Sequence, residues 1–116
     1  MSNYVFPPAP QSAVPVQGSS QHYAVRRIFC VGRNYAAHAR EMGADPEREP
    51  PFYFNKAPAH LVLSGASVPY ALGTQDLHHE MELVIALGAA AFRATPAQAR
   101  TRVFLGVIGH ERLFRK

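Results

Sequence analysis

The chain has 116 residues, a length that suits one small domain at most. Its single cysteine, Cys30, excludes an internal disulfide and fits a reducing compartment, so we expect a cytoplasmic protein. The net charge of +4 comes without a nucleic-acid-binding motif, and the longest apolar run, residues 83–92, is too short to cross a bilayer; we therefore expect neither nucleic-acid nor membrane partners.

The first 25 residues are rich in proline, serine, glutamine and glycine, which predicts an extended arm with little regular structure. The segment AVRRIFCVG (24–32) predicts a strand. Its continuous apolar run indicates that both strand faces are covered. The next segment, NYAAHAREMG, predicts a helix with Asn34 as N-cap and Gly43 in the left-handed conformation after its end.

The second half of the chain alternates short strands with turns. The expected elements are strands in FYFNK (52–56), HLVLSGASVPY (60–70, with a glycine turn), HEMELVIAL (79–87) and VFLGVIG (103–109), and a short helix in TPAQARTRV (95–103). Thr95 as N-cap, Pro96 at the first helical position and Gln98 at the third form a capping box. Steady strand–helix alternation is absent, so the fold class is α+β and β-rich rather than doubly wound.

The stretch DLHHEMELVIAL (76–87) places two acidic residues at the start of an apolar run. On a strand, Glu80 and Glu82 face the same side with Cα atoms roughly 6.5–7 Å apart. A divalent cation would explain why two like charges lie so close together. Because the donors are carboxylate oxygens, a hard ion such as Mg²⁺, Mn²⁺ or Ca²⁺ is favoured over zinc. His78 shares this face and His79 takes the other. The alternative reading is the polar outer face of an edge strand.

His38 and Glu41 are spaced i, i+3 in the expected helix and therefore share one helix face. A carboxylate beside an imidazole fixes its tautomer and raises its basicity, an arrangement suited to activating water. The alternative is a solvated ion pair.

Together, VGRNYAAHAREMG, FYFNKAP, the glycine turn and DLHHEMELVIALG resemble, in order and spacing, the fumarylacetoacetate hydrolase superfamily over residues 26–109. With no separate N-terminal domain, the chain is most similar to its short bacterial fumarylpyruvate hydrolases. The resemblance implies part of the mixed β-sandwich and β-roll fold of the superfamily's C-terminal-type domain. Residues 1–25 would be an arm, and residues 26–116 the N-terminal, incomplete part of one catalytic domain.

The resemblance also implies roles for matching positions. Glu80 and Glu82 correspond to the first two carboxylate ligands of the family's Mg²⁺ or Mn²⁺. His38 and Glu41 correspond to its water-activating catalytic pair. Lys56 falls at the substrate-binding lysine of the family's F-x-K-P stretch, although the proline here is displaced by one position (NKAP).

The resemblance weakens after residue 109. Glu111 stands where the family's third metal ligand, an aspartate in G-x-D-x-T-x-R-D, would fall in an ungapped alignment. It is a candidate ligand with a longer side chain, and the alternative is a chance coincidence of position. The residues that follow it, 112–114, depart from that pattern. We expect a frameshift or truncation of a longer gene to explain the departure, with apolar strand surface left exposed as its consequence.

The implied function is metal-dependent hydrolysis of the C–C bond of a small 2,4-diketo acid, converting fumarylpyruvate to fumarate and pyruvate in gentisate breakdown, with intact relatives forming homodimers. Three alternatives remain open. The chain could be a non-catalytic fragment, a weak metal- or anion-binding remnant, or a member with another superfamily activity such as hydratase, decarboxylase or isomerase.

Overall fold

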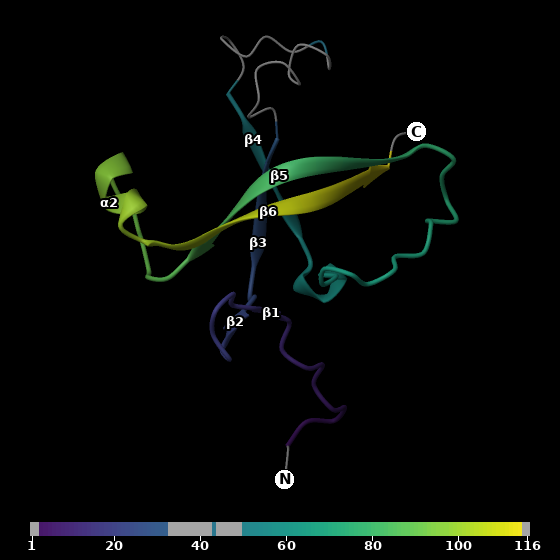
Figure 1. The fold of residues 1–116 in the computed structure, drawn as a ribbon, viewed down its shortest axis with the longest axis horizontal. Helices are drawn as coiled ribbons and strands as arrows, with labels where there is room; N and C mark the ends of the chain where they lie inside the picture. Colours follow the sequence, from purple (N-terminus) through teal and green to yellow (C-terminus); the bar gives the residue numbers. More distant parts are fainter. Residues whose placement is uncertain (1–2, 33–42, 44–49, 115–116) are drawn as a thin grey trace. The chain divides into compact units, whose positions relative to one another are not determined.

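The computed structural model describes residues 3–32, 43 and 50–114, with the backbone alone for 105–114. Within these ranges the strands form three separate two-stranded antiparallel sheets (Figure 1). The chain divides into two compact units, Met1–Ser67 and Val68–Lys116. The predicted β-rich class is confirmed.

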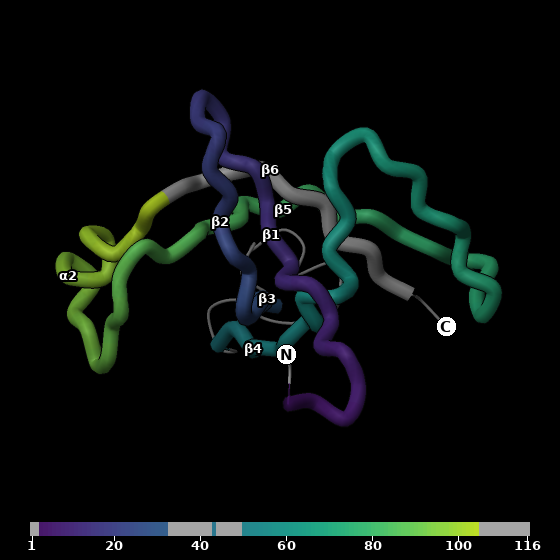
Figure 2. The backbone as a smooth tube through the Cα atoms, turned by 90° about the horizontal axis from the view of Figure 1, so that it is seen from below, coloured from purple at the N-terminus to yellow at the C-terminus, as the bar shows by residue number. Residues whose placement is uncertain are grey.

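The first unit begins with a small hairpin of β1 (Ala13–Pro15) and β2 (His22–Ala24), which run side by side in Figure 2. The backbone N–H of Val16 donates to the carbonyl of Gln21 at 3.1 Å and closes the turn. Gly18 occupies that turn with φ of 77°, a conformation that glycine adopts without steric cost. The segment that the composition predicts as an extended arm therefore contains regular structure.

The second sheet of this unit pairs β3 (Ile28–Gly32) with β4 (Phe52–Lys56) in antiparallel register, with Ile28 opposite Lys56. Both strands lie where the sequence predicts them. The expected burial of both β3 faces is wrong: Phe29 is 60% exposed. The side chains of β3 instead alternate between half-buried and exposed, because the sheet has only two strands in the described ranges.

The strand predicted within residues 60–70 is not formed. A 3₁₀ turn, Pro58–His60, is followed by irregular backbone and a turn in which the N–H of Ala66 donates to the carbonyl of Leu63 at 3.2 Å. Gly65 has φ of 85° in that turn, as a glycine turn requires. Pro69 cannot donate to a sheet ladder, which opposes strand formation in the rest of the segment.

The predicted helix over residues 34–43 lies outside the described residues except for its final glycine. Gly43 has φ of 76°, the left-handed value that the sequence predicts for a residue following a helix.

The second unit is built on a long twisted ribbon of β5 (Leu77–Leu87) and β6 (Val103–Phe114), with α2 (Pro96–Arg100) in the connection between them (Figure 1). β6 extends beyond its predicted end at residue 109, because the ladder continues until Phe114 lies opposite Leu77. In the described ranges no helix is long and apolar enough to cross a membrane.

The connection between the two long strands is held by its predicted capping box. The N–H of Gln98 donates to Oγ1 of Thr95 at 3.3 Å, and the N–H of Thr95 donates to Oε1 of Gln98 at 3.0 Å. The N–H of Gly88 donates to the carbonyl of Arg102 at 2.8 Å where the ribbon opens into the connection. These bonds fix the local geometry between β5 and β6.

Candidate metal site

The acidic residues of the opening half of β5 lie on one face of the strand. Glu80 and Glu82 are half-buried, while the intervening Met81 is 59% exposed. His78, two residues before Glu80, is half-buried as well, whereas His79 is exposed. Because side chains on a strand alternate between its two faces, this burial pattern places both carboxylates and the His78 imidazole on the same side.

From residue 81 to residue 87, the opposite face of β5 is apolar and exposed. Its large side chains are more than half exposed: Met81 at 59%, Leu83 at 64%, Ile85 at 53% and Leu87 at 56%. A continuous apolar run in a strand is typical of a strand covered on both faces, so this exposure is unusual for a folded domain. It agrees with the expectation that apolar strand surface is left exposed.

The ladder with β6 places a third acidic position beside this face. Glu111 is the register partner of Glu80, and Gly109 is the partner of Glu82. Residues directly opposite in an antiparallel pair belong to the same face of the sheet. The backbone register therefore puts position 111 on the Glu80 side of the ribbon, although its side chain is outside the described part of the structure.

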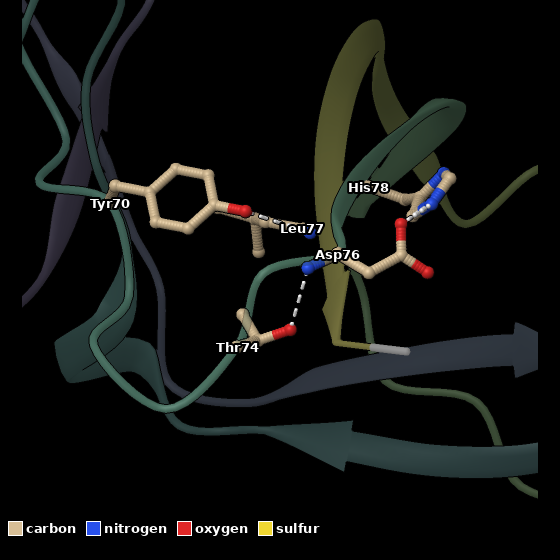
Figure 3. A network of polar contacts seen from close by, with 5 residues as sticks. All are labelled: Tyr70, Thr74, Asp76, Leu77 and His78. Carbon is tan, nitrogen blue, oxygen red and sulfur yellow. Dashed lines mark hydrogen bonds and ion pairs between the residues drawn. The ribbon is translucent and has the colours of Figure 1, made fainter. Parts of the chain in front are cut away.

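A polar network fixes the turn that leads into β5 (Figure 3). The hydroxyl of Tyr70 accepts from the N–H of Leu77 at 3.2 Å, and Oγ1 of Thr74 accepts from the N–H of Asp76 at 3.0 Å. Asp76 Oδ1 in turn lies 2.5 Å from Nε2 of His78. Since an ionised carboxylate only accepts, the ring nitrogen is the donor and Asp76 sets the orientation of the imidazole.

Sequence reasoning missed Asp76. The available signal was the D-x-H spacing at the strand start, which puts both residues on one side of the chain. The contact is solvent-exposed, with 43% of the His78 side chain and 58% of the Asp76 side chain accessible, so its effect on stability is small. Its consequence is positional: it holds an imidazole at the end of the face that carries the carboxylates.

The chemistry of this face fits a hard divalent cation. Glu80 and Glu82 supply carboxylate oxygens, the donor type that Mg²⁺ and Mn²⁺ prefer. Among the residues whose side chains are described, no group of three histidine, cysteine, aspartate or glutamate residues is close enough to hold a metal ion. Glu80 and Glu82 could therefore supply two of the ligands of a metal ion. Position 111, opposite Glu80 in the ladder, is where a third ligand could lie.

The remaining predicted site residues belong to the first unit. His38 and Glu41 lie outside the described residues. Lys56 is half-buried at the end of β4, opposite Ile28 in the ladder. The structure thus brings Glu80 and Glu82 together on one strand face, and it describes Lys56 in a separate compact unit.

Comparison with known protein families gives a match over most of the chain. The family described as fumarylacetoacetate (FAA) hydrolase C-terminal matches residues 27–112. That range includes β3, β4, β5, α2 and most of β6.

Individual relatives carry related but different names. The chain is 40% identical over 63 residues to the mitochondrial oxaloacetate decarboxylase of Dictyostelium discoideum, covering 54% of this chain and 29% of that protein. It is 45% identical over 60 residues to a fumarylpyruvate hydrolase of Ralstonia sp, covering 52% of this chain and 31% of the relative.

A solved structure is similar over nearly the whole chain. It is the crystal structure of fumarylpyruvate hydrolase from Pseudomonas aeruginosa in complex with Mn²⁺ and pyruvate, with 42% identity and a TM-score of 0.88. The match covers 95% of this chain and 49% of that one. The chain therefore spans about half of this solved relative and about a third of the two curated relatives.

Proposed function

We propose that the chain, which belongs to the fumarylacetoacetate hydrolase family, contributes the carboxylate face of a divalent-metal site that acts on a small 2-keto acid. Within that class we favour the hydrolysis of fumarylpyruvate to fumarate and pyruvate. The support for this choice is the similarity to the P. aeruginosa enzyme, whose structure contains Mn²⁺ and pyruvate.

One observation carries the metal site: Glu80 and Glu82 are half-buried on the same face of β5. An exposed polar edge, the alternative interpretation of the E-x-E pattern, would leave these carboxylates as accessible as their neighbours. The reverse is found, because the apolar Met81 and Leu83 between and beside them are more exposed. Two carboxylates on one strand face are stabilised by a cation of opposite charge.

We assign the ligands of Mg²⁺ or Mn²⁺ to Glu80, Glu82 and Glu111. When bound, the cation would supply Lewis acidity at the oxygens of the 2-keto acid. We further propose that His38, with its carboxylate neighbour Glu41, accepts a proton from the attacking water. Lys56 would bind an anionic group of the substrate.

The proposed reaction balances with water alone. Water adds to the acyl carbonyl of fumarylpyruvate, and its proton passes to His38. The bond between that carbonyl carbon and the adjacent methylene carbon breaks, which releases fumarate. The electron pair of the broken bond delocalises onto the neighbouring 2-keto group, and protonation of the methylene carbon gives pyruvate.

A second candidate is decarboxylation of oxaloacetate. The 40% identity to the D. discoideum protein of that name favours it, over a segment of about half the chain. Both reactions break the bond between C3, the methylene carbon next to the 2-keto group, and C4. Both leave the electron pair of that bond on C3, where the 2-keto group can delocalise it. The same carboxylate face could therefore serve either, and the substrate must be decided by measurement.

We further propose gentisate breakdown as the pathway, the cytoplasm as the location and a homodimer as the state of the intact enzyme. No nucleic-acid or membrane partner is proposed.

The function is tested by supplying fumarylpyruvate and oxaloacetate separately to the purified chain, each with Mn²⁺, with Mg²⁺ and with excess chelator. We expect metal-dependent loss of fumarylpyruvate absorbance with equimolar fumarate and pyruvate. Faster metal-dependent consumption of oxaloacetate would replace the first candidate with the second. No metal-dependent turnover of either acid would reject the proposal for this chain.

A further inference from the structure

The proline segment, which we define as residues 4–10 (YVFPPAP), presents a row of apolar side chains to solvent. Tyr4 is 68% exposed, Val5 90% and Phe6 80%. Within the part of the chain that the structure describes, no hydrogen bond involves residues 3–10. Consecutive large apolar side chains at such exposure are typical of an interaction site, and neither the metal site nor the proposed reaction uses them.

The sequence of this segment restricts its shape. Pro7, Pro8 and Pro10 each fix φ near about −65°, and a residue that precedes a proline is confined to extended conformations. Residues 7–10 accordingly belong to neither a helix nor a strand. Such a segment favours the polyproline II conformation, whose carbonyl groups make no internal hydrogen bonds and can accept from a partner. Because the segment is already restricted, little conformational entropy is lost when it binds.

The β3–β4 ladder carries a matching surface on one of its two faces. Phe29 is 60% exposed and Tyr53 71%, whereas their strand neighbours Cys30 and Phe54 are half-buried. The register places Val31 opposite Tyr53 and Asn55 opposite Phe29, so these four residues share one side of the sheet. We define this aromatic face by its four exposed side chains: Phe29, Val31, Tyr53 and Asn55.

The chemistry and spacing of the aromatic face suit a proline-rich ligand, because such segments dock on aromatic surfaces. Phe29 and Tyr53 are diagonal neighbours in the ladder, with Cα atoms about 7–8 Å apart. Two or three residues of a polyproline II helix span roughly 6–9 Å, so both rings can contact one proline segment. The Tyr53 hydroxyl and the Asn55 amide are donors for its carbonyl groups. Neither surface contains a charged residue, so the contact desolvates no charge.

The exposure of both surfaces indicates a second copy of the chain as the partner. The proline segment and the aromatic face do not cover each other within one copy, because the rings of both are exposed. A chain that carries a segment and its receptor is self-complementary, and a two-fold pair forms each contact twice.

The area available is adequate for such a pair. The rings of Tyr4, Phe6, Phe29 and Tyr53 are between 60% and 80% exposed. At about 150–250 Å² per aromatic side chain, the four rings of each copy would together bury on the order of 1,100 Å² in the pair. This is close to the lower end, about 1,200 Å², of stable interfaces, before the prolines and Val31 are included.

We propose that the proline segment of one copy docks on the aromatic face of a second copy, and that the exchange is reciprocal. The proposal deepens the homodimer of the proposed function, on which it rests for the expectation of two copies, by naming the two surfaces that meet. The extended arm expected from the sequence thereby acquires a role in association.

The proposal is tested by sedimentation equilibrium of the full chain, with Leu83→Gln in every protein to interrupt the separate apolar face of β5. We expect this parent to dimerise. The face variant, Phe29→Gln with Tyr53→Gln, and the arm variant, Tyr4→Gln with Phe6→Gln, should each raise the dimer Kd at least about tenfold, since buried aromatic side chains dominate interfaces. Phe92→Gln removes an 89% exposed ring from the connection between β5 and β6, and should stay within about twofold of the parent.

Mixing the two variants tests the exchange itself. The face variant has an intact proline segment and the arm variant has an intact aromatic face, so one of the two contacts can form between them. The mixture should therefore associate more tightly than either variant alone. A monomeric parent, a mixture no tighter than its components, or an equal loss with Phe92→Gln would each overturn the proposal.

A synthetic peptide of residues 2–12 provides a test without any substitution in the protein. It should inhibit dimerisation of the parent, and a peptide with Pro7→Ala and Pro8→Ala should be at least about fivefold weaker, because it is less restricted before binding. No inhibition by the first peptide, or equal inhibition by both, would contradict docking of the proline segment.

All of these measurements are made without metal ion or substrate, so their outcome is separable from that of the proposed reaction. A chain that dimerises through the proline segment but consumes no 2-keto acid would retain this inference and lose the reaction. A chain that turns over fumarylpyruvate while its arm variant dimerises like the parent would lose this inference and retain the reaction.

Discussion

The β3–β4 and β5–β6 ladders are the same kind of element, an antiparallel pair, yet they gather opposite charges. The short ladder collects Arg26, Arg27 and Lys56 at one end, because two strand ends meet there. The long ladder collects Glu80 and Glu82 along one face, because they are two residues apart on one strand. The alternation of side chains along one strand thus explains why Glu80 and Glu82 lie together. The pairing register of two strands explains why the basic residues do.

The two arrangements predict different effects for substitutions in the two ladders. Removing acidic groups from one face of a strand leaves the ladder intact and removes the donors. Changes in the connection between β5 and β6, or on the apolar face of β5, should act on stability or association instead.

The largest effect is expected from the double substitution Glu80→Gln and Glu82→Gln. It should reduce metal-dependent turnover by at least about 100-fold, because both described oxygen donors for the cation lose their charge. Met81→Gln, on the other face between the two positions, should stay within about twofold of the wild type, since the metal-facing side is unchanged. Equal losses of turnover in both variants would show that the face with Glu80 and Glu82 has no special role in metal binding.

The next largest effect is expected from alanine substitutions at two glycines, Gly88 directly after β5 and Gly32 at the end of β3. A Cβ added at Gly88 would lie 2.8 Å from Cβ of Phe104, an atom that cannot move without the backbone. Gly88→Ala should therefore lower the free energy of unfolding by about 1–3 kcal/mol. A Cβ at Gly32 would meet only the tip of the half-exposed Phe52 ring, which can rotate away. Gly32→Ala should change stability by less than about 1 kcal/mol in urea unfolding.

The connection in the long ladder depends on its helix cap. Thr95→Ala removes the hydroxyl that accepts from the N–H of Gln98, and should cost about 1 kcal/mol. Thr95→Ser retains the hydroxyl and should restore nearly all of the loss. Urea midpoints measure both, and a serine variant as unstable as the alanine variant would refute the cap as the cause.

The smallest effect on stability is expected on the apolar face of β5. Leu83 is 64% exposed, so Leu83→Gln should change the free energy of unfolding by less than about 0.5 kcal/mol. The same variant should reduce concentration-dependent association in sedimentation, because it interrupts the exposed apolar row. Leu72→Gln, at a fully exposed loop leucine, provides the control. A large destabilisation by Leu83→Gln would mean that this face is buried.

Local sequence signals predicted local structure well. FYFNK became β4 with the predicted bounds, and Thr95, Pro96 and Gln98 formed the predicted cap, because neighbouring residues determine these features. The shared face of Glu80 and Glu82 followed from strand parity alone. These features require no knowledge of distant contacts.

Features that depend on pairing were not predictable in the same way. The strand expected within residues 60–70 did not form, since strand formation requires a partner as well as apolar residues. The position of Glu111 opposite Glu80 required the β5–β6 register, and the grouping of Arg26, Arg27 and Lys56 required that of β3 and β4. The contact between Asp76 and His78 depends on a turn held by Tyr70 and Thr74.

The metal site is tested most directly by titrating the full chain with Mn²⁺ in a calorimeter, with Glu80→Gln and Met81→Gln in parallel. Saturable binding is expected that Glu80→Gln weakens at least about tenfold and Met81→Gln leaves within about twofold. No saturable binding by the wild type, or equal affinity in Glu80→Gln, would contradict the assignment of this strand face to a metal ion.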